Sequence, residues 1–320
     1  MCQADEVDSD LLPLSRPGVD RDAHRRNHPD LIEELRASSS TRVVHVSDGR
    51  VAADQATTSG ADQPRLRWHD PVPADALWIY LGRDEDADYL AAITSEQATT
   101  GLARGMDDPQ GAVTSAELRM LTLRDIGWML SGAEAGLAAT ALALANWHAT
   151  HGFCPRCGAA TDVVESGWVR RCPDDGSQHF PRTDPAVIMA ITDPEDRLLL
   201  GHAAHWPEGQ FSVPAGFVEP GESLESAVRR EVLEETAVRV HEVTYAASQP
   251  WPFPASLMLG FRGRTDDREA TPDGVEVTAA RFVTREQIAE EWRTGQTRLP
   301  RPTSIACSLI EEWYGQPLPR

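Results

Sequence analysis

The sequence contains no lysine, so all 30 of its basic residues are arginine, and 50 acidic residues outnumber them. The formal net charge is -20 at pH 7. Affinity for long polyanions comes mainly from Lys and Arg side chains that neutralise phosphates, so this balance argues against an extended nucleic-acid surface. A local basic groove stays compatible with the composition.

Long hydrophobic runs are absent as well. No stretch approaches the roughly 18 consecutive apolar residues of a membrane helix. The acidic N-terminus also lacks the basic start and apolar stretch of a signal peptide. We therefore expect a cytoplasmic protein that does not associate with a membrane. Its 320 residues, of which 41% are hydrophobic, suffice for roughly two or three domains with cores of their own.

Cysteine is scarce, with five residues. Two of them stand alone, which argues against a disulfide framework, whereas Cys154, Cys157 and Cys172 cluster. Their C-x2-C-x14-C spacing is typical of the two knuckles of a zinc ribbon. The position where a fourth Cys is due holds Asp175 instead.

Two interpretations of this cluster stay open. Zinc accepts carboxylate oxygen, so the three thiols and Asp175 would close a tetrahedral structural site, with Asp174 or His179 as substitutes for Asp175. Alternatively, the ribbon has lost its metal and is held by aromatic residues such as Trp168 and Phe180. Three thiolates and a fourth ligand leave no open position, which argues against a catalytic zinc. The acidic chain argues against a DNA-binding ribbon.

The pattern of elements divides the chain into a smaller N-terminal α+β domain (1–150), a ribbon-like segment (151–182) and a C-terminal domain (183–320). The ribbon is too short to hold a core without a metal. We find no internal repeat. The first domain has strand-like runs at 42–46, 77–81 and 89–93 and ends in an Ala-rich helix over about 133–151. For the C-terminal domain the sequence predicts an α+β, layered arrangement. Its expected strands are at 186–192, 197–202, 256–264 and 275–283, and its expected helices are near 223–236, 285–293 and 303–314.

One predicted helix carries acidic residues at a suggestive spacing. Glu231, Glu234 and Glu235 stand at i, i+3 and i+4 and so share one sector of the helix. Crowded carboxylates repel one another, and bound Mg²⁺ or Mn²⁺ would remove the conflict. A solvated acidic face is the plain alternative, but the apolar Val228 and Val232 lie in or beside the same sector.

This segment resembles the Nudix box, GX5EX7REUXEEXGU with U aliphatic. It departs from the box at Ala237, where the family has Gly. The matching positions are Gly216, Glu222, Arg230, Glu231, Val232, Glu234, Glu235 and Val238.

The resemblance implies an α/β/α sandwich and roughly two to three Mg²⁺ or Mn²⁺ ions per site. It implies that Glu231 and Glu235 are metal ligands and that the backbone carbonyl of Ala215 is another. Glu234 would be a further ligand or the group that positions the attacking water. Glu276 matches the family's late metal-binding Glu across a two-residue insertion.

Two further expectations concern the ends of this helix. By resemblance, Glu222 and Arg230 form a structural pair that ties the preceding loop to the helix. The helix should end near Thr236, where chains often adopt a left-handed conformation that Gly takes freely and Ala takes at a cost of about 1 kcal/mol. Since Ala237 carries no ligand atom, we expect the metal cluster to assemble all the same.

A second segment, SQPWPFPAS at 248–256, bears on the substrate. Alternating prolines exclude a helix and predict a stiff extended strip that lines a pocket for a flat ring. At this distance from the Nudix helix the segment resembles the NADH pyrophosphatase branch of the family, which also removes NAD caps from RNA. The resemblance implies that the following residues contact the substrate: Phe180, Phe217, Gln249, Pro250, Trp251, Pro252, Phe253, Pro254, Ala255, Ser256, Ala306 and, more weakly matched, Arg119.

The implied activity is hydrolysis of the pyrophosphate of NAD(H), giving a nicotinamide mononucleotide and AMP, by a homodimer that also acts on NAD-capped RNA ends. An ADP-ribose or dinucleoside-polyphosphate pyrophosphatase is the nearest enzymatic alternative. A non-catalytic NAD(H) sensor on a dead Nudix fold is the alternative from another class. Such sensors tend to lose the acidic ligands, which are present here.

Overall fold

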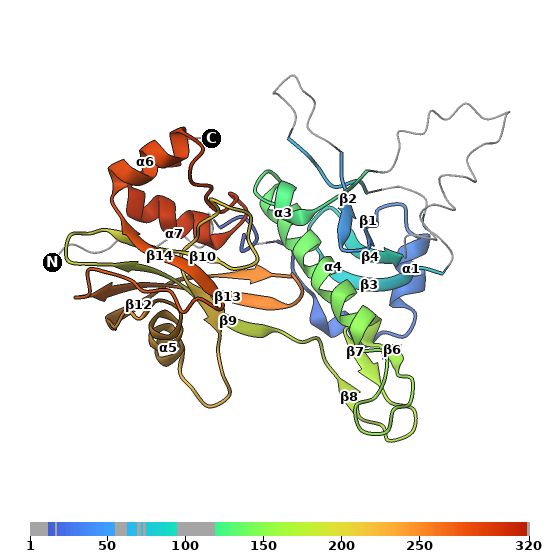
Figure 1. Ribbon diagram of the computed structural model, residues 1–320. Coiled ribbons are helices and arrows are strands. Elements are labelled where there is room, and N and C mark those ends of the chain that lie inside the picture. The colour runs from blue at the N-terminus through green and yellow to red at the C-terminus, as the bar shows by residue number, and fades with distance from the viewer. Residues whose placement is uncertain are drawn as a thin grey trace. The chain divides into compact units, whose positions relative to one another are not determined.

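The computed structural model describes residues 12–16, 18–54, 63–68, 72, 75–94 and 119–318. The chain forms two compact units. The N-terminal unit comprises Arg16–Arg182 and, from much later in the sequence, Pro252–Ala255. The C-terminal unit comprises Thr183–Trp251, everything from Ser256 onward and the described residues before Arg16. Figure 1 labels the elements of both units.

The N-terminal unit is built on a five-stranded sheet in the order β3-β4-β1-β2-β5. Strands β1 and β4 pair in parallel, and the other neighbours pair antiparallel. The helices of the unit are α1 (Leu31–Ala37), α3 (Leu123–Ile126) and α4 (Gly132–Thr150). Its strands are β1 (Arg42–Ser47), β2 (Arg50–Ala52), β3 (Leu77–Arg83), β4 (Asp88–Thr94) and β5 (Met120–Leu121).

Helix α4 confirms the Ala-rich helix expected over 133–151. Ser131 begins it with a capping box: its hydroxyl accepts from the backbone N–H of Glu134, whose carboxylate accepts from the backbone N–H of Ser131. Small Ala side chains let the helix approach the sheet closely, and Leu142 and Trp147 are buried along it. Among the described residues, no helix is long and apolar enough to cross a membrane.

The ribbon-like segment follows α4 and is a three-stranded sheet in the order β6-β7-β8. Its strands are β6 (Asp162–Val164), β7 (Val169–Arg171) and β8 (Gln178–His179). Trp168 stabilises it, since the indole N–H donates to the carbonyl of Tyr80 at 2.7 Å and the guanidinium of Arg26 lies 3.6 Å from the ring centroid. The ribbon is thereby tied to strand β3.

The C-terminal unit holds a six-stranded sheet in the order β12-β13-β9-β10-β14, with β11 paired to β9. Helices α5 (Leu224–Thr236), α6 (Arg285–Arg293) and α7 (Ile305–Tyr314) complete it. Its strands are β9 (Asp184–Thr192), β10 (Leu198–Ala203), β11 (Ala215–Phe217), β12 (Val240–Trp251), β13 (Ser256–Thr265) and β14 (Val277–Val283).

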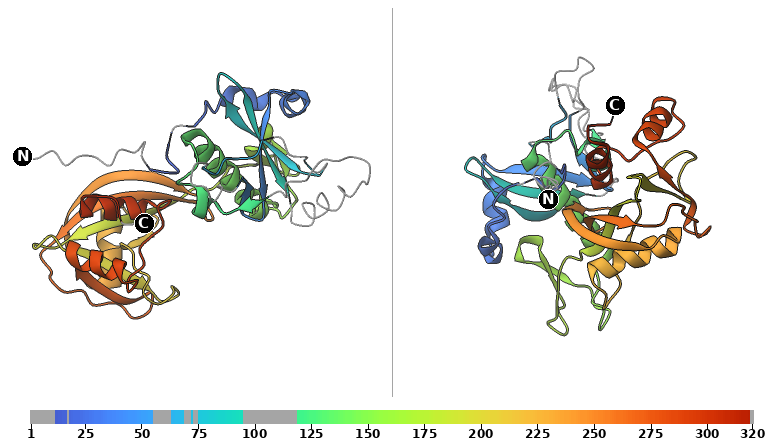
Figure 2. Two further views of the ribbon diagram at one scale, coloured as in Figure 1. Left: turned by 90° about the horizontal axis from the view of Figure 1, so that it is seen from above. Right: turned by 90° about the vertical axis from the view of Figure 1, so that its left-hand side faces the viewer.

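Strand β9 shows how the layers of this unit arise. Val187, Met189 and Ile191 pack into one core with Val228 and Val232 of α5. The alternating Ile188 and Ala190 pack into a second core with α6 and α7. Because successive side chains of a strand point to opposite faces, the sheet is buried between one helix and two. Figures 1 and 2 show α5 on one face and α6 and α7 on the other. The expected α/β/α sandwich is confirmed.

The two sheets have the same plan. Taken along the chain, β1, β2, β3, β4 and β5 correspond to β9, β10, β12, β13 and β14, and both sheets have the same neighbours with one parallel pair, β1 with β4 and β9 with β13. In both units two helices follow the last strand. The expectation of no internal repeat is therefore wrong at the level of topology. Between β2 and β3, the described residues contain no counterpart of β11 or α5.

Candidate functional site

Helix α5 forms where the Nudix-like segment predicts it. The Ser223 hydroxyl accepts from the backbone N–H of Ser226 and begins the helix, which ends at Thr236. Ala237 then takes the left-handed conformation, with φ 58° and ψ 16°. The expected turn thus forms although an Ala occupies it.

Arg230 holds the loop before α5 against the helix. Its guanidinium donates to both carboxylate oxygens of Glu222, at 2.6 and 3.2 Å, and to the carbonyl of Phe217 at 2.9 Å. It also lies 2.9 Å from Glu231 Oε1 and 3.1 Å from Glu234 Oε2. The expected Glu222–Arg230 pair is present, and the same Arg orients two carboxylates of the helix.

The carboxylates at the C-terminal half of α5 are close enough to act on one another. Burial, followed by the charges of Glu231, Glu276, Asp273 and Glu234, raises the pKa of Glu235 to about 7. Burial also raises the pKa of Glu231, and Glu276 contributes there too. The charge of Glu276, which the sequence placed across an insertion, thus acts on both carboxylates. The side chain of Glu234 stays 60% exposed.

Gly216 is required by the approach of Glu231. A Cβ built on Gly216 would overlap the carboxylate of that side chain, so any larger residue would push the acid away. Gly216 lies in β11, between Ala215 and Phe217, and pairs with Val187 of β9. The Nudix box thus requires Gly at position 216, because the backbone of β11 lies directly against the carboxylate of Glu231.

The loop before β14 is fastened to the end of α5. The backbone N–H of Thr271 donates to the carbonyl of Thr236 at 2.8 Å, and that of Asp273 donates to the carbonyl of Glu235 at 3.1 Å. The Asp273 carboxylate accepts from the backbone N–H groups of the three residues from Val275, Glu276 among them. Sequence analysis missed Asp273, although the Asp-Gly pair it opens is a recognisable turn signal.

This acidic cluster fits divalent metal ions. Half-buried carboxylates that mutually raise their pKa values are short of a countercharge, and hard cations prefer oxygen ligands. The contact of Gly216 with the Glu231 carboxylate leaves the β11 backbone beside the same oxygens. The residues present therefore suit the Mg²⁺ or Mn²⁺ that Nudix hydrolases use.

The SQPWPFPAS segment is a hairpin tip rather than an extended strip. Gln249–Trp251 end β12, residues 252–255 form the turn with a cis Phe253–Pro254 peptide, and Ser256 opens β13. The expectation of a continuous extended segment is wrong, because the chain reverses direction within it.

Gln249 differs from its neighbours because it is fully buried. Its amide donates to the carbonyl of Thr303 at 3.1 Å and accepts from the backbone N–H of Ile305 at 2.7 Å. The side chain thus links β12 to the first turn of α7, which also contains the buried Ala306. Its geometry is that of a positioning residue.

The hairpin turn is held by residues of the N-terminal unit, to which it belongs. The Asn146 side chain donates to the carbonyls of Pro252 and Pro254, at 2.9 and 3.1 Å. The Arg124 guanidinium lies 4.4 Å from the ring centroid of Phe253. Sequence analysis missed both residues, since nothing in their local pattern indicates a partner more than a hundred positions away.

The remaining predicted contact residues are distributed over both units. Phe217 ends β11 in the C-terminal unit and is 58% exposed. Phe180 follows β8 in the N-terminal unit and is 62% exposed, and Arg119 is an exposed residue next to β5. Exposed aromatic rings of this size are available for stacking.

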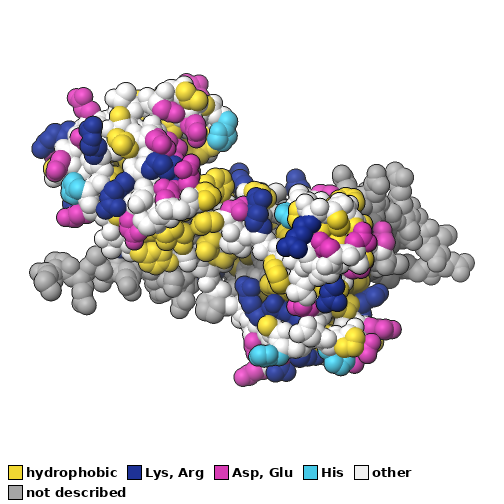
Figure 3. Space-filling model, turned by 90° about the horizontal axis from the view of Figure 1, so that it is seen from below, with side chains coloured by type: hydrophobic (Ala, Val, Ile, Leu, Met, Phe, Trp, Pro, Cys, Tyr) yellow, Lys and Arg dark blue, Asp and Glu magenta, His cyan; other side chains and the backbone are white. Residues whose placement is uncertain are grey.

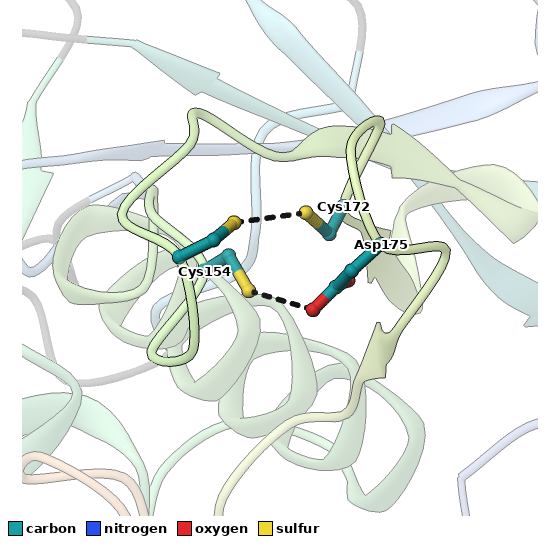
Figure 4. A group of neighbouring side chains, drawn as sticks. Cys154, Cys172 and Asp175 are labelled. Carbon is teal, nitrogen blue, oxygen red and sulfur yellow. Dashed lines mark hydrogen bonds between the residues drawn. The ribbon is translucent and has the colours of Figure 1, made fainter.

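The cysteine cluster converges as its spacing predicts. In Figure 4, Cys172 and Asp175 come from one loop and face the sulfur atoms of a second loop, which carries Cys154. The Cys157 and Cys172 sulfurs lie 3.5 Å apart, and Cys154 Sγ lies 3.8 Å from Asp175 Oδ2. Of the described residues, Cys154, Cys157, Cys172 and Asp175 form the group whose ligand atoms all lie within 4.8 Å of one another.

These distances suit zinc. Bonds of about 2.3 Å to a tetrahedral zinc separate its ligands by roughly 3.8 Å. Although burial opposes it, hydrogen bonds from the backbone N–H groups of Arg156 and Cys157 lower the pKa of Cys154 to about 6. The Ser177 hydroxyl and backbone N–H lower the pKa of Asp175 to about 2. The converging thiols and carboxylate are ligands that zinc accepts, so the group suits a bound cation.

Three family models match the chain, in the order of its segments. They are the NADH pyrophosphatase-like rudimentary NUDIX domain over residues 40–147, the NADH pyrophosphatase zinc ribbon domain over 149–180 and the NUDIX domain over 182–301.

Similar proteins span nearly the whole chain. An NAD-capped RNA hydrolase NudC of Mycobacterium bovis is 37% identical over 317 residues, 94% of this chain and 94% of that protein. The human NAD-capped RNA hydrolase NUDT12 is 42% identical over 192 residues, 56% of this chain and 42% of its own. A NUDIX hydrolase structure from Nitrosomonas europaea matches 52% of this chain and 96% of its own at 25% identity, with a TM-score of 0.42, too low to support a structural argument.

The α/β/α sandwich and the acid-bearing helix α5 define a Nudix hydrolase. The preceding rudimentary sheet and zinc ribbon narrow the class, because all three family models match in sequence order. This chain belongs to the NADH pyrophosphatase family of Nudix hydrolases.

Proposed function

We propose that this enzyme hydrolyses the pyrophosphate bond of NAD(H), giving NMN(H) and AMP, and that it also removes NAD caps from RNA. The proposal is supported by the charges of Glu231 and Glu276, which help to raise the pKa of Glu235, within a chain whose relatives are named NAD-capped RNA hydrolases. A sensor on a dead Nudix fold has no need of such a cluster.

The acidic cluster would hold Mg²⁺ or Mn²⁺ through the carboxylates of Glu231, Glu235 and Glu276 and the backbone carbonyl of Ala215. Such ions stabilise the charge that develops when water attacks a phosphorus of the diphosphate in line. Glu234, whose side chain is exposed, would position the water or complete the ligand set. Arg230 keeps Glu231 and Glu234 in place by direct contact.

The hairpin tip would bind the dinucleotide. Trp251 and Phe253 offer rings, Pro250, Pro252 and Pro254 fix the backbone, and Gln249 acts by fastening β12 to α7. The turn residue Ala255, together with Ser256 and Ala306, would complete the contact. Phe180, Phe217 and Arg119 would join it as the family pattern implies.

The ribbon would bind one structural zinc through Cys154, Cys157, Cys172 and Asp175. We further propose the three-part organisation 1–150, 151–182 and 183–320, a homodimer, and a place in the cytoplasm. Of the described residues, the cysteines at 154, 157, 172 and 307 form no disulfide bond, which supports a reducing compartment. Size-exclusion chromatography with light scattering tests the dimer.

A substrate panel tests the proposed specificity. The protein is incubated with NADH, ADP-ribose, a diadenosine polyphosphate and NAD-capped RNA in the presence of Mg²⁺ or Mn²⁺, and the products are separated by chromatography. The proposal predicts that NADH and NAD-capped RNA are cleaved with the highest kcat/KM. Preferential cleavage of ADP-ribose or the polyphosphate would assign the site to the neighbouring class, and no cleavage at all would favour a sensor.

A further inference from the structure

The N-terminal unit contains a cavity of about 390 Å³, within the range of roughly 300 to 1,000 Å³ typical of small-molecule sites. It lies where β1, β4 and α4 begin, and its lining includes none of the residues assigned above. Its lining includes Arg42, Arg65, Trp68, Tyr89 and Glu134.

This cavity occupies the topological counterpart of the hairpin tip between β12 and β13. Asp84 opens the turn at 84–87 between β3 and β4, as Pro252 opens the turn at 252–255 between β12 and β13. At the start of the parallel pair, Arg42 stands opposite Tyr89 in the register. In the C-terminal sheet Asp184 stands opposite Ser256 in the same place.

The helix that borders the cavity repeats the correspondence. Helix α4 begins at the N-cap Ser131, and α7 begins at the N-cap Ser304. Two residues after each cap stands an alanine: Ala133, which lines the cavity, and Ala306, which the family pattern places at the substrate. Both regions therefore combine a hairpin turn, the start of the parallel strands and the first turn of a helix.

The lining suits a flat ring joined to an anion. Trp68 and Tyr89 meet edge to face with their ring centroids 5.6 Å apart, and Met129 and Leu137 add apolar surface. Arg42 contributes a guanidinium that donates to the Tyr89 hydroxyl at 3.3 Å. Together with a second Arg in the lining, it can form charge-assisted hydrogen bonds to a phosphate.

The two acidic residues of the lining bond to its walls. The Asp84 carboxylate accepts from the Tyr89 hydroxyl at 2.6 Å and from the backbone N–H of Ala87 at 2.9 Å. The Glu134 carboxylate accepts from the backbone N–H of Leu66 at 3.0 Å and from the Ser131 hydroxyl at 2.8 Å. These bonds fix the walls of the cavity in the absence of a ligand.

We propose that this cavity binds a free mononucleotide, with the base against Trp68 and the phosphate at Arg42 and Arg65. The choice of ligand class rests on the proposed dinucleotide role of the hairpin tip. The acidic residues of α5 belong to the C-terminal unit, and we assign ligand binding alone to this cavity.

Photo-crosslinking to the full-length protein tests the proposal. An azido analogue of AMP is irradiated with the protein, and the labelled peptides are mapped by mass spectrometry, with AMP or inorganic phosphate as competitor. We expect label in the segments 63–68 or 84–94 that AMP suppresses at lower concentration than phosphate does. Trp68→Ala should reduce this label roughly tenfold, a loss consistent with one base-stacking contact, whereas Trp68→Phe, which keeps a ring, should retain most of it.

Two further variants make the outcome decisive. If Trp68→Ala lowers the melting temperature, Arg42→Gln is compared with Arg42→Lys, and the label should fall with Gln and persist with Lys. In Glu235→Gln the label in the N-terminal unit should persist while NADH turnover is lost. Label confined to 249–256 and the start of α7, or label that AMP does not suppress, would overturn the cavity assignment. Failure of the wild type to cleave NADH would count against the proposed function alone.

Discussion

The two sheets of this protein have the same strand order but differ in the elements inserted between their strands. The C-terminal sheet carries β11 and α5 between its second and third strands, and these two elements hold Gly216, Glu231 and Glu235. In the N-terminal sheet the described residues of the same connection form no such helix. The sheet and its two following helices are thus a scaffold, and the inserted strand and helix supply the acidic chemistry.

The units also differ in what stabilises them. The C-terminal sheet has a hydrophobic core on each face. The ribbon of the N-terminal unit is a small sheet with few buried side chains, among them Cys154, Val169 and Cys172. The N-terminal sheet has a hydrophobic core of its own around Tyr80 and Leu90, so we expect a metal to matter for the ribbon rather than for the sheet. Figure 3 shows acidic and basic side chains interspersed on the face in view, as the absence of a chain-wide basic surface predicts.

The largest expected effect comes from removing a charge from α5. Glu235→Gln or Glu231→Gln should lower kcat by a factor of roughly 100 or more, because each removes a ligand for ions that stabilise the transition state. Folding should survive. Glu225→Gln, an exposed change in the first turn of the same helix, serves as the control and should leave kcat near wild type. Activity within a few-fold of wild type in Glu235→Gln would remove α5 from the chemistry.

The second effect concerns the ribbon. Elemental analysis should find about one zinc per chain, and Asp175→Ala or Cys157→Ser should release it and lower the melting temperature, because metal binding is coupled to folding of such small segments. Asp174→Asn is the matched control, since Asp174 lies outside the group of converging ligand atoms. Zinc-free wild type with full stability would show that the ribbon is held by its aromatic contacts instead.

A third effect is the pH dependence of the metal-free protein. The folded state raises the pKa of Glu235 from 4.5 to about 7, so between these values the folded chain keeps a proton that the unfolded chain has lost. Glu235 therefore makes stability fall as the pH rises through this window. Urea unfolding of metal-free wild type and Glu235→Gln across the window should show a smaller fall in the variant. Identical pH profiles would contradict the raised pKa.

The smallest effect is expected at Ala237, the departure from the Nudix box. Ala237→Gly should remove the strain of a non-glycine residue in the left-handed conformation at φ 58°. We expect a gain of up to about 1 kcal/mol in the free energy of unfolding. Since the acidic residues precede it, kcat should change less than about tenfold. Thermal melting, light scattering and NADH turnover of both versions check this. An inert, monomeric Ala237 protein beside an active, dimeric Gly variant would mean that the departure disables the enzyme.

Sequence patterns predicted what depends on local chemistry. The Ala-rich helix α4 and the Nudix helix α5 form where they were expected, and the spacing of the α5 acids indicated a shared sector of the helix. Strand β12 was missed, because Pro250 disfavours a strand, whereas an edge strand such as β12 tolerates it. The shared strand order was also invisible, since topology depends on pairing between distant segments. For the same reason no pattern indicated that Asn146 holds the turn at Pro252.

The most direct measurement of the central claim is the product analysis of NADH incubated with Mg²⁺ and the purified protein. We expect NMNH and AMP in equal amounts, with product formation at least roughly 100-fold slower in Glu235→Gln than in the wild type. Release of nicotinamide, or intact NADH after prolonged incubation with the wild type, would contradict it.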